Sequence, residues 1–149
     1  MELVVFIGIQ ATGKSAFYQQ RFFDSHVRIN LDMLKTRRRE QILLAACLEA
    51  KQPFVVDNTN VTRESRAGYI SQAKASRFSV VGYYFKSALQ SAIERNDQRI
   101  GKARIPLRGI VATHRKLEPP SYDEGFDQLF YVEVGGDGAF IVKDWSDEV

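Results

Sequence analysis

Apolar residues in this chain occur in short continuous runs that stop at a glycine or a carboxylate. Residues 3–7 form one run that ends at Gly8, and residues 53–57 form another that ends at Asp57. Runs of this length predict strands buried on both faces, as in parallel sheets that are covered by helices. The other predicted strands are residues 26–30, residues 79–85, and the two arms of a hairpin, residues 129–134 and 139–142.

Amphipathic segments separate these runs and predict helices. Asp32 is expected to cap a helix that continues to about Lys51 and buries an apolar stripe. The predicted stripe consists of Leu34, Ile42, Ala45, Ala46 and Leu48. One further helix is predicted to begin near Lys14 and to end before Asp24. The remaining predicted helices cover residues 62–76, 87–97 and 106–117. Because strands and helices alternate, we expect an α/β fold of three layers, with a mainly parallel sheet, helices on both faces and a C-terminal hairpin at the edge.

The composition is that of an ordinary globular domain. The 149 residues are expected to form a single domain, 1–149. Hydrophobic residues make up 44% of the chain and charged residues 26%, and this composition excludes a disordered chain. No apolar stretch approaches the roughly 18 residues of a membrane-spanning helix, and the N-terminus has no signal-peptide pattern. Cys47 is the only cysteine, so an internal disulfide is excluded and a cytoplasmic location is expected. The net charge of +3 is compatible with a nucleic-acid partner without indicating one.

A strong motif is GIQATGKS at residues 8–15, which matches the P-loop pattern G-x-x-x-x-G-K-[ST] in every fixed position, between a predicted strand and a predicted helix. In such loops the backbone N–H groups and the helix N-terminus hold phosphates. Lys14 is expected to reach the β- and γ-phosphates of ATP, and Ser15 is expected to bind Mg²⁺. The predicted nucleotide-binding residues here are Gly8, Gln10, Ala11, Thr12, Gly13, Lys14 and Ser15. The motif thus predicts a P-loop NTPase fold and nucleotide binding, but not yet a reaction.

Two carboxylates follow strands of the predicted sheet. Asp57 ends a strand, which is the Walker-B position, and is expected to bind Mg²⁺ together with Ser15. Asp32 follows residues 26–30 and is expected at the same carboxyl edge of the sheet, where ligands bind. It is a candidate general base for an attacking hydroxyl, a role compatible with capping the next helix. A plain cap or turn residue is the alternative for each carboxylate.

Two basic clusters accompany these carboxylates. One surrounds a glycine-containing loop between two predicted helices, and we expect residues 95–106 to form a lid that brings a cation onto the transferred phosphate. The residues of this cluster are Arg95, Arg99, Lys102 and Arg104. The second cluster begins one turn beyond Asp32 and comprises Lys35, Arg37, Arg38 and Arg39. An ordinary basic loop is the alternative for the first cluster. A solvated helix face is the plainer interpretation of the second cluster, and contact with the phosphoryl acceptor is the functional one.

Together the motifs resemble those of the 5′-polynucleotide kinases, including the kinase domain of polynucleotide kinase/phosphatase. The resemblance runs from Val4 to about Phe126 and rests, in order, on GIQATGKS (8–15), INLD (29–32), DNTNVTRESR (57–66), RNDQR with RIP (95–106) and SYDEGF (121–126). It implies that Lys14 and Ser15 hold phosphate and magnesium and that Asp32 is the base for a 5′-hydroxyl. It also implies that Arg99, with Arg95 nearby, contacts the β- and γ-phosphates.

The resemblance extends to the acceptor side, with two departures. The implied substrate-binding residues are Asp32, Lys35, Arg38, Asp57 and Asn58. Leu31 stands where the family usually has arginine, and Lys35 stands where some members have the arginine that clamps the acceptor's phosphate. Lysine keeps the charge but lacks the two-pronged guanidinium, so the acceptor is less well defined than the chemistry. Neither the paired aspartates of the phosphatase nor a ligase lysine motif is present, so we expect the kinase module alone.

The leading hypothesis is therefore an ATP- and Mg²⁺-dependent kinase of the 5′-hydroxyl end of RNA or DNA. A kinase of the same fold that acts on a small metabolite or a nucleoside hydroxyl is the alternative. A nucleotide-dependent switch or assembly ATPase fits less well, because no guanine-binding Asn-Lys-x-Asp motif is present. The oligomeric state and the choice between DNA and RNA are left open.

Overall fold

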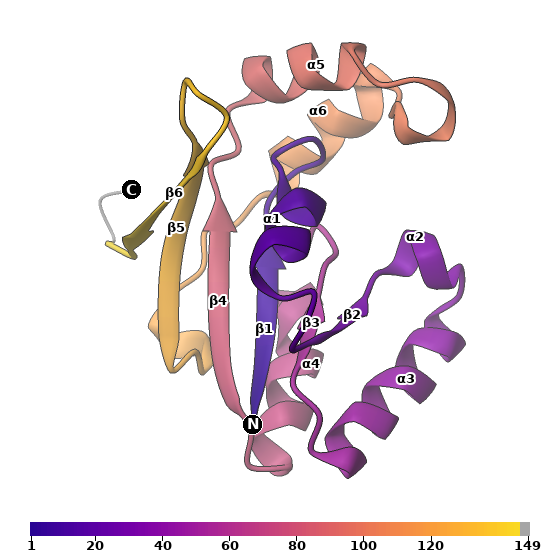
Figure 1. The fold of residues 1–149 in the computed structure, drawn as a ribbon, viewed down its shortest axis with the longest axis vertical. Coiled ribbons are helices and arrows are strands. Elements are labelled where there is room, and N and C mark those ends of the chain that lie inside the picture. The colour runs from indigo at the N-terminus through magenta and orange to yellow at the C-terminus, as the bar shows by residue number, and fades with distance from the viewer. Residues whose placement is uncertain (147–149) are drawn as a thin grey trace.

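Six strands form one sheet, in the order β2-β3-β1-β4-β5-β6, in the computed structural model, which describes residues 1–146 (Figure 1). Strands β1 to β5 pair in parallel, and β6 runs antiparallel to β5 at the edge. The strands are β1 Glu2–Ile7, β2 Val27–Ile29, β3 Phe54–Val56, β4 Ser79–Phe85, β5 Gln128–Val134 and β6 Phe140–Asp144. The predicted parallel sheet with a C-terminal hairpin is confirmed. Residues 147–149, the last of the predicted domain, lie outside the described residues.

Helices cover both faces of this sheet, as predicted (Figure 1). They are α1 Lys14–Arg21, α2 Leu31–Leu34, α3 Arg37–Ala50, α4 Arg63–Ala75, α5 Leu89–Asp97 and α6 Leu107–Lys116, with two 3₁₀ turns, η1 Gly101–Ala103 and η2 Tyr122–Glu124. The helices α3 and α4 pack on one face, α1 packs on the other, and α5 and α6 lie over the carboxyl ends of the strands. None of the helices within residues 1–146 has the length and apolar character needed to cross a bilayer.

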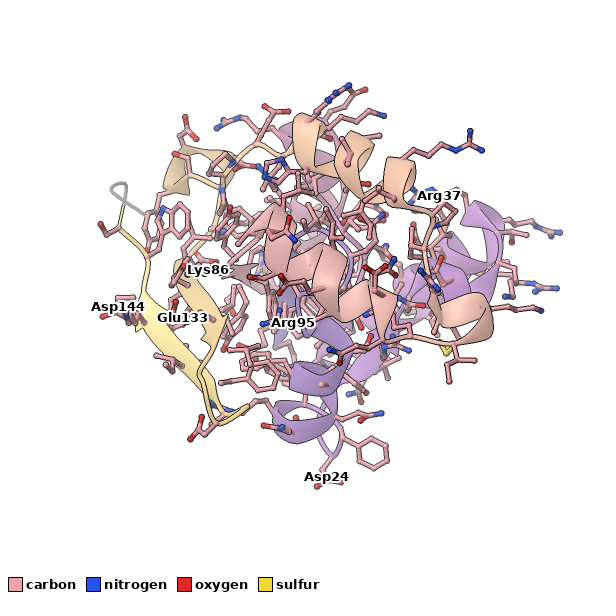
Figure 2. The ribbon with its side chains drawn as sticks, turned by 90° about the horizontal axis from the view of Figure 1, so that it is seen from above. Asp24, Arg37, Lys86, Arg95, Glu133 and Asp144 are labelled. Carbon is pink, nitrogen blue, oxygen red and sulfur yellow. The ribbon has the colours of Figure 1, made fainter. Side chains whose placement is uncertain are left out.

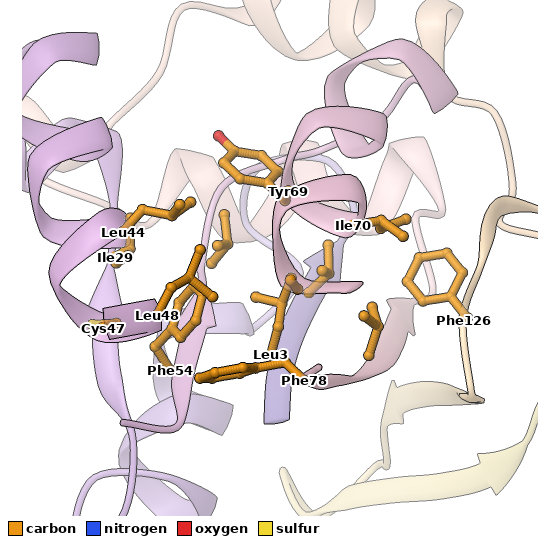
Figure 3. Close-up of a cluster of buried hydrophobic side chains, with 14 of the residues drawn as sticks. Leu3, Ile29, Leu44, Cys47, Leu48, Phe54, Tyr69, Ile70, Phe78 and Phe126 are labelled. Atoms are coloured by element: carbon orange, nitrogen blue, oxygen red, sulfur yellow. The ribbon is translucent and has the colours of Figure 1, made fainter. Parts of the chain in front are cut away.

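The central strand β1 supplies the core on both faces because its side chains alternate in direction. Leu3, Val5 and Ile7 join the cluster beneath α3 and α4, where Figure 3 shows Leu44, Leu48 and Ile70 of those helices packed against the sheet. Val4 and Phe6 face α1. Every residue from Leu3 to Ile7 is 0% exposed. The continuous apolar run in the sequence therefore corresponds to a strand with no solvent face.

The predicted single helix from Asp32 to Lys51 is wrong, because the chain breaks after one turn. Lys35 ends α2 with φ 76°, a left-handed conformation, and Thr36 then caps α3 by accepting a hydrogen bond from the Arg39 N–H. Asp32 is also not the cap of α2. The side-chain oxygen of Asn30 accepts from the Met33 N–H at 3.0 Å, which leaves the Asp32 carboxylate unused by the backbone.

The break shifts the phase of the helix, so the predicted apolar stripe is largely wrong. Ile42 is 59% exposed, and Ala45 and Ala46 are exposed too. The buried residues of α3 are instead Glu40, Leu44, Cys47 and Leu48. The predicted stripe was counted from Asp32 as if residues 32–51 formed one helix. These residues belong to two helices, so the count places the buried face of the second helix wrongly.

Candidate active site

The P-loop lies between the end of β1 and the start of α1, as the motif predicts. Gly13 occupies the N-cap of α1 with φ 94°, a conformation that side chains disfavour. A Cβ at this position would also lie 3.0 Å from the ring of Phe140 on β6. The Gly8 N–H donates to the carbonyl oxygen of Thr59 at 2.9 Å, and the Thr12 hydroxyl donates to that of Ile9 at 2.9 Å. Glycine is required here both by the turn and by the hairpin packed against it.

Lys14 is held inside the loop. Its Nζ donates hydrogen bonds to the carbonyl oxygens of Gly8 at 3.0 Å and Ile9 at 2.7 Å. Burial lowers the pKa of the Lys14 ammonium from its usual value to about 8. The negative charges of Asp57 and Asp32 raise this pKa, but burial outweighs them. An anion that enters the loop would therefore stabilise the charged form of Lys14.

ATP binding is expected to take up a proton once the pH exceeds the Lys14 pKa of about 8. The free protein loses the Lys14 charge above this pH, whereas bound phosphates favour the charged form. Affinity should be level below it and fall by up to about tenfold per pH unit above it. Titration calorimetry in two buffers of different ionisation enthalpy measures the proton uptake.

A matched control for this pH dependence is Lys143→Met, which removes an exposed lysine on β6. It should leave the profile of ATP affinity against pH unchanged. An affinity that stays level as the pH rises beyond the Lys14 pKa would contradict the lowered value.

Ser15 and Asp57, the predicted Mg²⁺ ligands, lie together. The Ser15 hydroxyl donates to Oδ2 of Asp57 at 3.2 Å, and Asp57 is 2% exposed at the end of β3. Two oxygen donors fit Mg²⁺, which keeps several waters and takes few protein ligands. Among residues 1–146 no group of three or more His, Cys, Asp or Glu side chains is placed to hold a metal. The donor set thus suits a metal shared with phosphates rather than a metal held by the protein alone.

Arg28 on β2 contacts both of these residues and was not expected from the sequence. Its Nε donates to Asp57 Oδ2 at 2.9 Å, and its Nη2 donates to the Ser15 hydroxyl at 3.0 Å. The guanidinium balances the buried Asp57 carboxylate, which is costly to bury without a partner. A lone arginine in a three-residue strand offers no sequence signal, because its contact depends on β3 lying next to β2.

Asp32 lines the same cavity as Lys14, Ser15 and Asp57. The side chain is exposed to that cavity, and its negative charge acts on Lys14. The structure records no hydrogen bond to the Asp32 carboxylate from the described residues. Asp32 is therefore a carboxylate whose proton-accepting oxygens are open to a ligand.

The cavity has a volume of about 1150 Å³ and extends well beyond the P-loop. Its walls come from the P-loop, α2, the start of α3, the segment that follows β3, α4 and the loop between α5 and α6. Asn58 lines it, as predicted, and so does Arg99. Figure 1 shows that the α5–α6 loop and α2 lie on the same side of the P-loop. The space accommodates a nucleotide on the P-loop and a second molecule beside Asp32.

This cavity is not lined by Lys35, Arg38 or Arg95, which were predicted for the site. Lys35 and Arg38 are exposed and do not contribute to the cavity wall, whereas their neighbour Arg37 does. Arg95 supports the P-loop from the other side, where its Nη1 donates to the Ala11 carbonyl at 3.3 Å. Figure 2, which looks onto this end of the molecule, shows Arg95 near the middle and Arg37 displaced toward α3.

The predicted lid is a loop closed at its base by Asn96. The Asn96 side chain is 3% exposed, donates to the Ile105 carbonyl at 2.6 Å and accepts from the Ile105 N–H at 2.8 Å. Arg99 on the loop donates to the carbonyl of Ala103 at 3.2 Å. These two hydrogen bonds between Asn96 and Ile105 hold together the ends of a short loop. The loop carries Arg99 and Lys102 at the cavity wall.

Glu40 and Tyr69 also line the cavity, and the sequence analysis did not single them out. Glu40 is 0% exposed, and it lies four residues before Leu44 and seven before Cys47. It therefore shares the buried face of α3. A glutamate on the apolar face of a helix is a sequence signal for a buried carboxylate. It was missed because the prediction assigned the wrong residues to the buried face of this helix.

Comparison with known proteins gives one family match and several structural neighbours. A family model described as AAA domain matches residues 35–120, more than half of the chain. The bifunctional polynucleotide phosphatase/kinase of Schizosaccharomyces pombe is 26% identical over 132 residues, which are 86% of this chain and 32% of that protein. The chain thus spans about a third of the length of this curated relative.

Solved structures share the fold at lower identity. Kti12 from Chaetomium thermophilum, in complex with ADP-AlF3, has a TM-score of 0.63 at 17% identity, and 88% of each chain is covered. A gluconokinase from Sinorhizobium meliloti has a TM-score of 0.59 at 20% identity, with 89% of this chain and 82% of that chain covered. These likenesses show a P-loop kinase fold.

Proposed function

This chain belongs to the AAA domain family and has a P-loop kinase fold, and on that premise we propose that it transfers the γ-phosphoryl group of ATP to a 5′-hydroxyl end of RNA or DNA. The resemblance to 5′-polynucleotide kinases that the motifs indicate is confirmed at the level of family and fold. The acceptor, the metal and the residue roles are part of the proposal. So are a cytoplasmic location and a single kinase domain with a lid over about residues 95–106.

One observation carries the proposal: an unpaired carboxylate lies in the same cavity as the phosphate-binding loop. Asp32, Lys14 and Ser15 all line this cavity, and Asp32 is close enough for its charge to act on Lys14. A nucleotide switch or sensor has no need for a free carboxylate at this place. A kinase needs it to take the proton of the attacking hydroxyl.

The transfer follows from this arrangement. The acceptor oxygen bonds to the γ-phosphorus while the bond to the bridging oxygen of the β-phosphate breaks. Asp32 accepts the hydroxyl proton, and Lys14 with Arg99 offsets the negative charge of the transferred group. Arg99 now contacts a carbonyl of its own loop, so this hydrogen bond has to break for Arg99 to contact the phosphates. Mg²⁺ bound by Ser15 and Asp57 would neutralise further phosphate charge.

Exposed basic residues at the start of α3 border the acceptor side of the cavity, which suits a nucleic-acid strand. Arg37 lines the same cavity as Asp32, and its side chain is 68% exposed. Lys35 and Arg38 flank it on the outer surface. In the proposal Arg37 contacts the acceptor near its 5′ end, and the outer pair attracts the polyanion over a longer range.

The test is an acceptor screen with γ-labelled ATP. One arm contains an oligonucleotide with a free 5′-hydroxyl, and its matched control contains the same oligonucleotide already 5′-phosphorylated. Label on the first and not on the second supports the proposal. A parallel panel of nucleosides, polyols and sugar acids tests the small-molecule alternative, which the fold of the gluconokinase neighbour favours. Label confined to that panel would overturn the nucleic-acid assignment, and hydrolysis insensitive to every acceptor would overturn the kinase assignment.

A further inference from the structure

A buried carboxylate lies on the cavity wall between α3 and α4. Glu40 is 0% exposed, and both of its oxygens accept hydrogen bonds. Oε1 accepts from the Tyr69 hydroxyl at 2.9 Å and from Arg37 Nη1 at 3.0 Å. Oε2 accepts from Nδ2 of Asn58 at 3.2 Å. The transfer step described above uses neither Glu40 nor Tyr69, so another role has to account for them.

Stability is a poor explanation for this cluster. Taking a carboxylate out of water is costly, and well-packed apolar residues in place of a buried ion pair are often as stable or more so. The Tyr69 ring packs within the apolar cluster while its hydroxyl points out of it (Figure 3). Burial and the Glu40 charge raise the pKa of Tyr69, which keeps its hydroxyl a donor. The hydrogen bonds of Glu40 therefore orient the side chains that contact it, and they add little to the stability of the fold.

The hydrogen bonds lead from Glu40 to the helix that carries Asp32. Asn58 donates to Glu40 through Nδ2 and, through Oδ1, accepts from the Leu31 N–H at 2.8 Å. Leu31 is the first residue of α2, and its N–H has no partner within the helix. A four-residue helix is not stable by itself. The position of α2, and with it that of Asp32, depends on such anchors.

A carboxylate can only accept hydrogen bonds, so Glu40 sets the orientation of the Asn58 amide. With its N–H₂ group toward Glu40, the Asn58 carbonyl has to face Leu31. The flipped amide would place two acceptors against each other at one end and two donors at the other. We propose that Glu40 and Asn58 are positioning residues that orient α2 and aim Asp32 at the acceptor hydroxyl. This inference rests on the proposed function, in which Asp32 is the base.

An exchange of the two side chains tests the proposal. Glu40→Gln sets an N–H₂ group against that of Asn58, and Asn58→Asp sets a carboxylate against that of Glu40. The double variant Glu40→Gln/Asn58→Asp restores the chain, because Gln donates to Asp and Asp accepts from the Leu31 N–H. It also keeps the total charge of the pair.

Each single variant is expected to lower kcat by ~10- to 10²-fold, the effect of a small misplacement at the reacting centre. The KM for ATP should change little, because the P-loop is untouched. Amide hydrogen exchange at Leu31 should rise about tenfold, because the Asn58 amide is expected to flip in Glu40→Gln and repulsion between the two carboxylates is expected to displace the new side chain in Asn58→Asp. The double variant should recover most of kcat and of the protection. The matched control is Glu49→Gln, the same change at an exposed position of α3, which should alter neither quantity.

Three results would overturn the proposal. Wild-type kcat in both single variants would show that Asp32 needs no such support. Unchanged Leu31 exchange in them would show that the link does not hold α2. A double variant as slow as the singles, with exchange restored, would mean that Asn58 contacts the substrate itself. If the wild-type protein transfers phosphate to no acceptor, the proposed function fails, while the exchange measurement still decides whether Glu40 and Asn58 anchor α2.

Discussion

Asp32→Asn is expected to lower phosphoryl transfer by at least ~10²-fold while ATP binding is unchanged. Asparagine has nearly the same shape but cannot take a proton, and general-base catalysis is typically worth at least this factor. The Asp32 carboxylate accepts no recorded hydrogen bond within residues 1–146, so its replacement breaks no structural contact there. Initial rates with the acceptor identified by the screen, together with calorimetric ATP titration, measure the two quantities separately.

The control for this variant is Asp24→Asn, the same change at an exposed position beyond α1, which Figure 2 shows at the lower edge of the view, away from Arg37 and Arg95. It should leave the rate of transfer at the wild-type level. Transfer retained in Asp32→Asn would refute the assignment of the base. Loss of ATP binding in that variant would instead show that Asp32 serves the nucleotide rather than the acceptor.

Arg66→Met is expected to cost about 3–5 kcal/mol of the free energy of unfolding, the range for breaking a buried ion pair. Arg66 is 0% exposed on α4, and its Nε and Nη2 donate to the two oxygens of Glu124 at 2.8 and 3.0 Å. Its Nη1 donates to the carbonyls of Asn60 at 2.8 Å and Glu118 at 3.0 Å. Methionine fills similar space but leaves the buried Glu124 carboxylate with only the Ser121 N–H at 3.0 Å and the more distant Arg63 guanidinium at 3.9 Å among the described residues. Urea unfolding followed by circular dichroism measures the loss.

Arg63→Met provides the matched comparison one turn earlier on the same helix. Arg63 pairs with the exposed Asp123 at 2.9 Å, and such surface pairs contribute little because solvent screens them. Its removal should change the unfolding midpoint only slightly. Equal losses in the two variants would mean that the buried pair contributes no more than a surface one. The Arg66 pair also joins the DNTNVTRESR and SYDEGF segments, because Arg66 ends the first and Glu124 lies in the second.

Several features could be predicted from the sequence because they depend on neighbouring residues. The strand predicted at residues 79–85 matches β4, Ser79–Phe85, because its β-branched and aromatic residues suit a strand with helices over both faces. The helix predicted at 62–76 matches α4, Arg63–Ala75, whose Thr62 cap and Ser65 partner lie three residues apart. The P-loop pattern predicted its own turn and helix, and Asp57 was predicted from its position after a buried strand. Within the site, Lys14, Ser15 and Asp57 were therefore predicted to lie together, and all three line the cavity.

Contacts between distant segments decided the rest. Arg28 meets Asp57 only because β2 pairs with β3, and Glu40 meets Asn58 only because α3 and the segment after β3 border one cavity. The break at Lys35 separates α3 from α2, whose first residue, Leu31, is held from outside by Asn58. Hydrophobic periodicity and local capping determined which segments become strands and helices here, because those preferences act over a few residues. Which side chains surround Asp32 depended on how distant segments pack, since a hydrogen bond across the fold leaves no pattern in the local sequence.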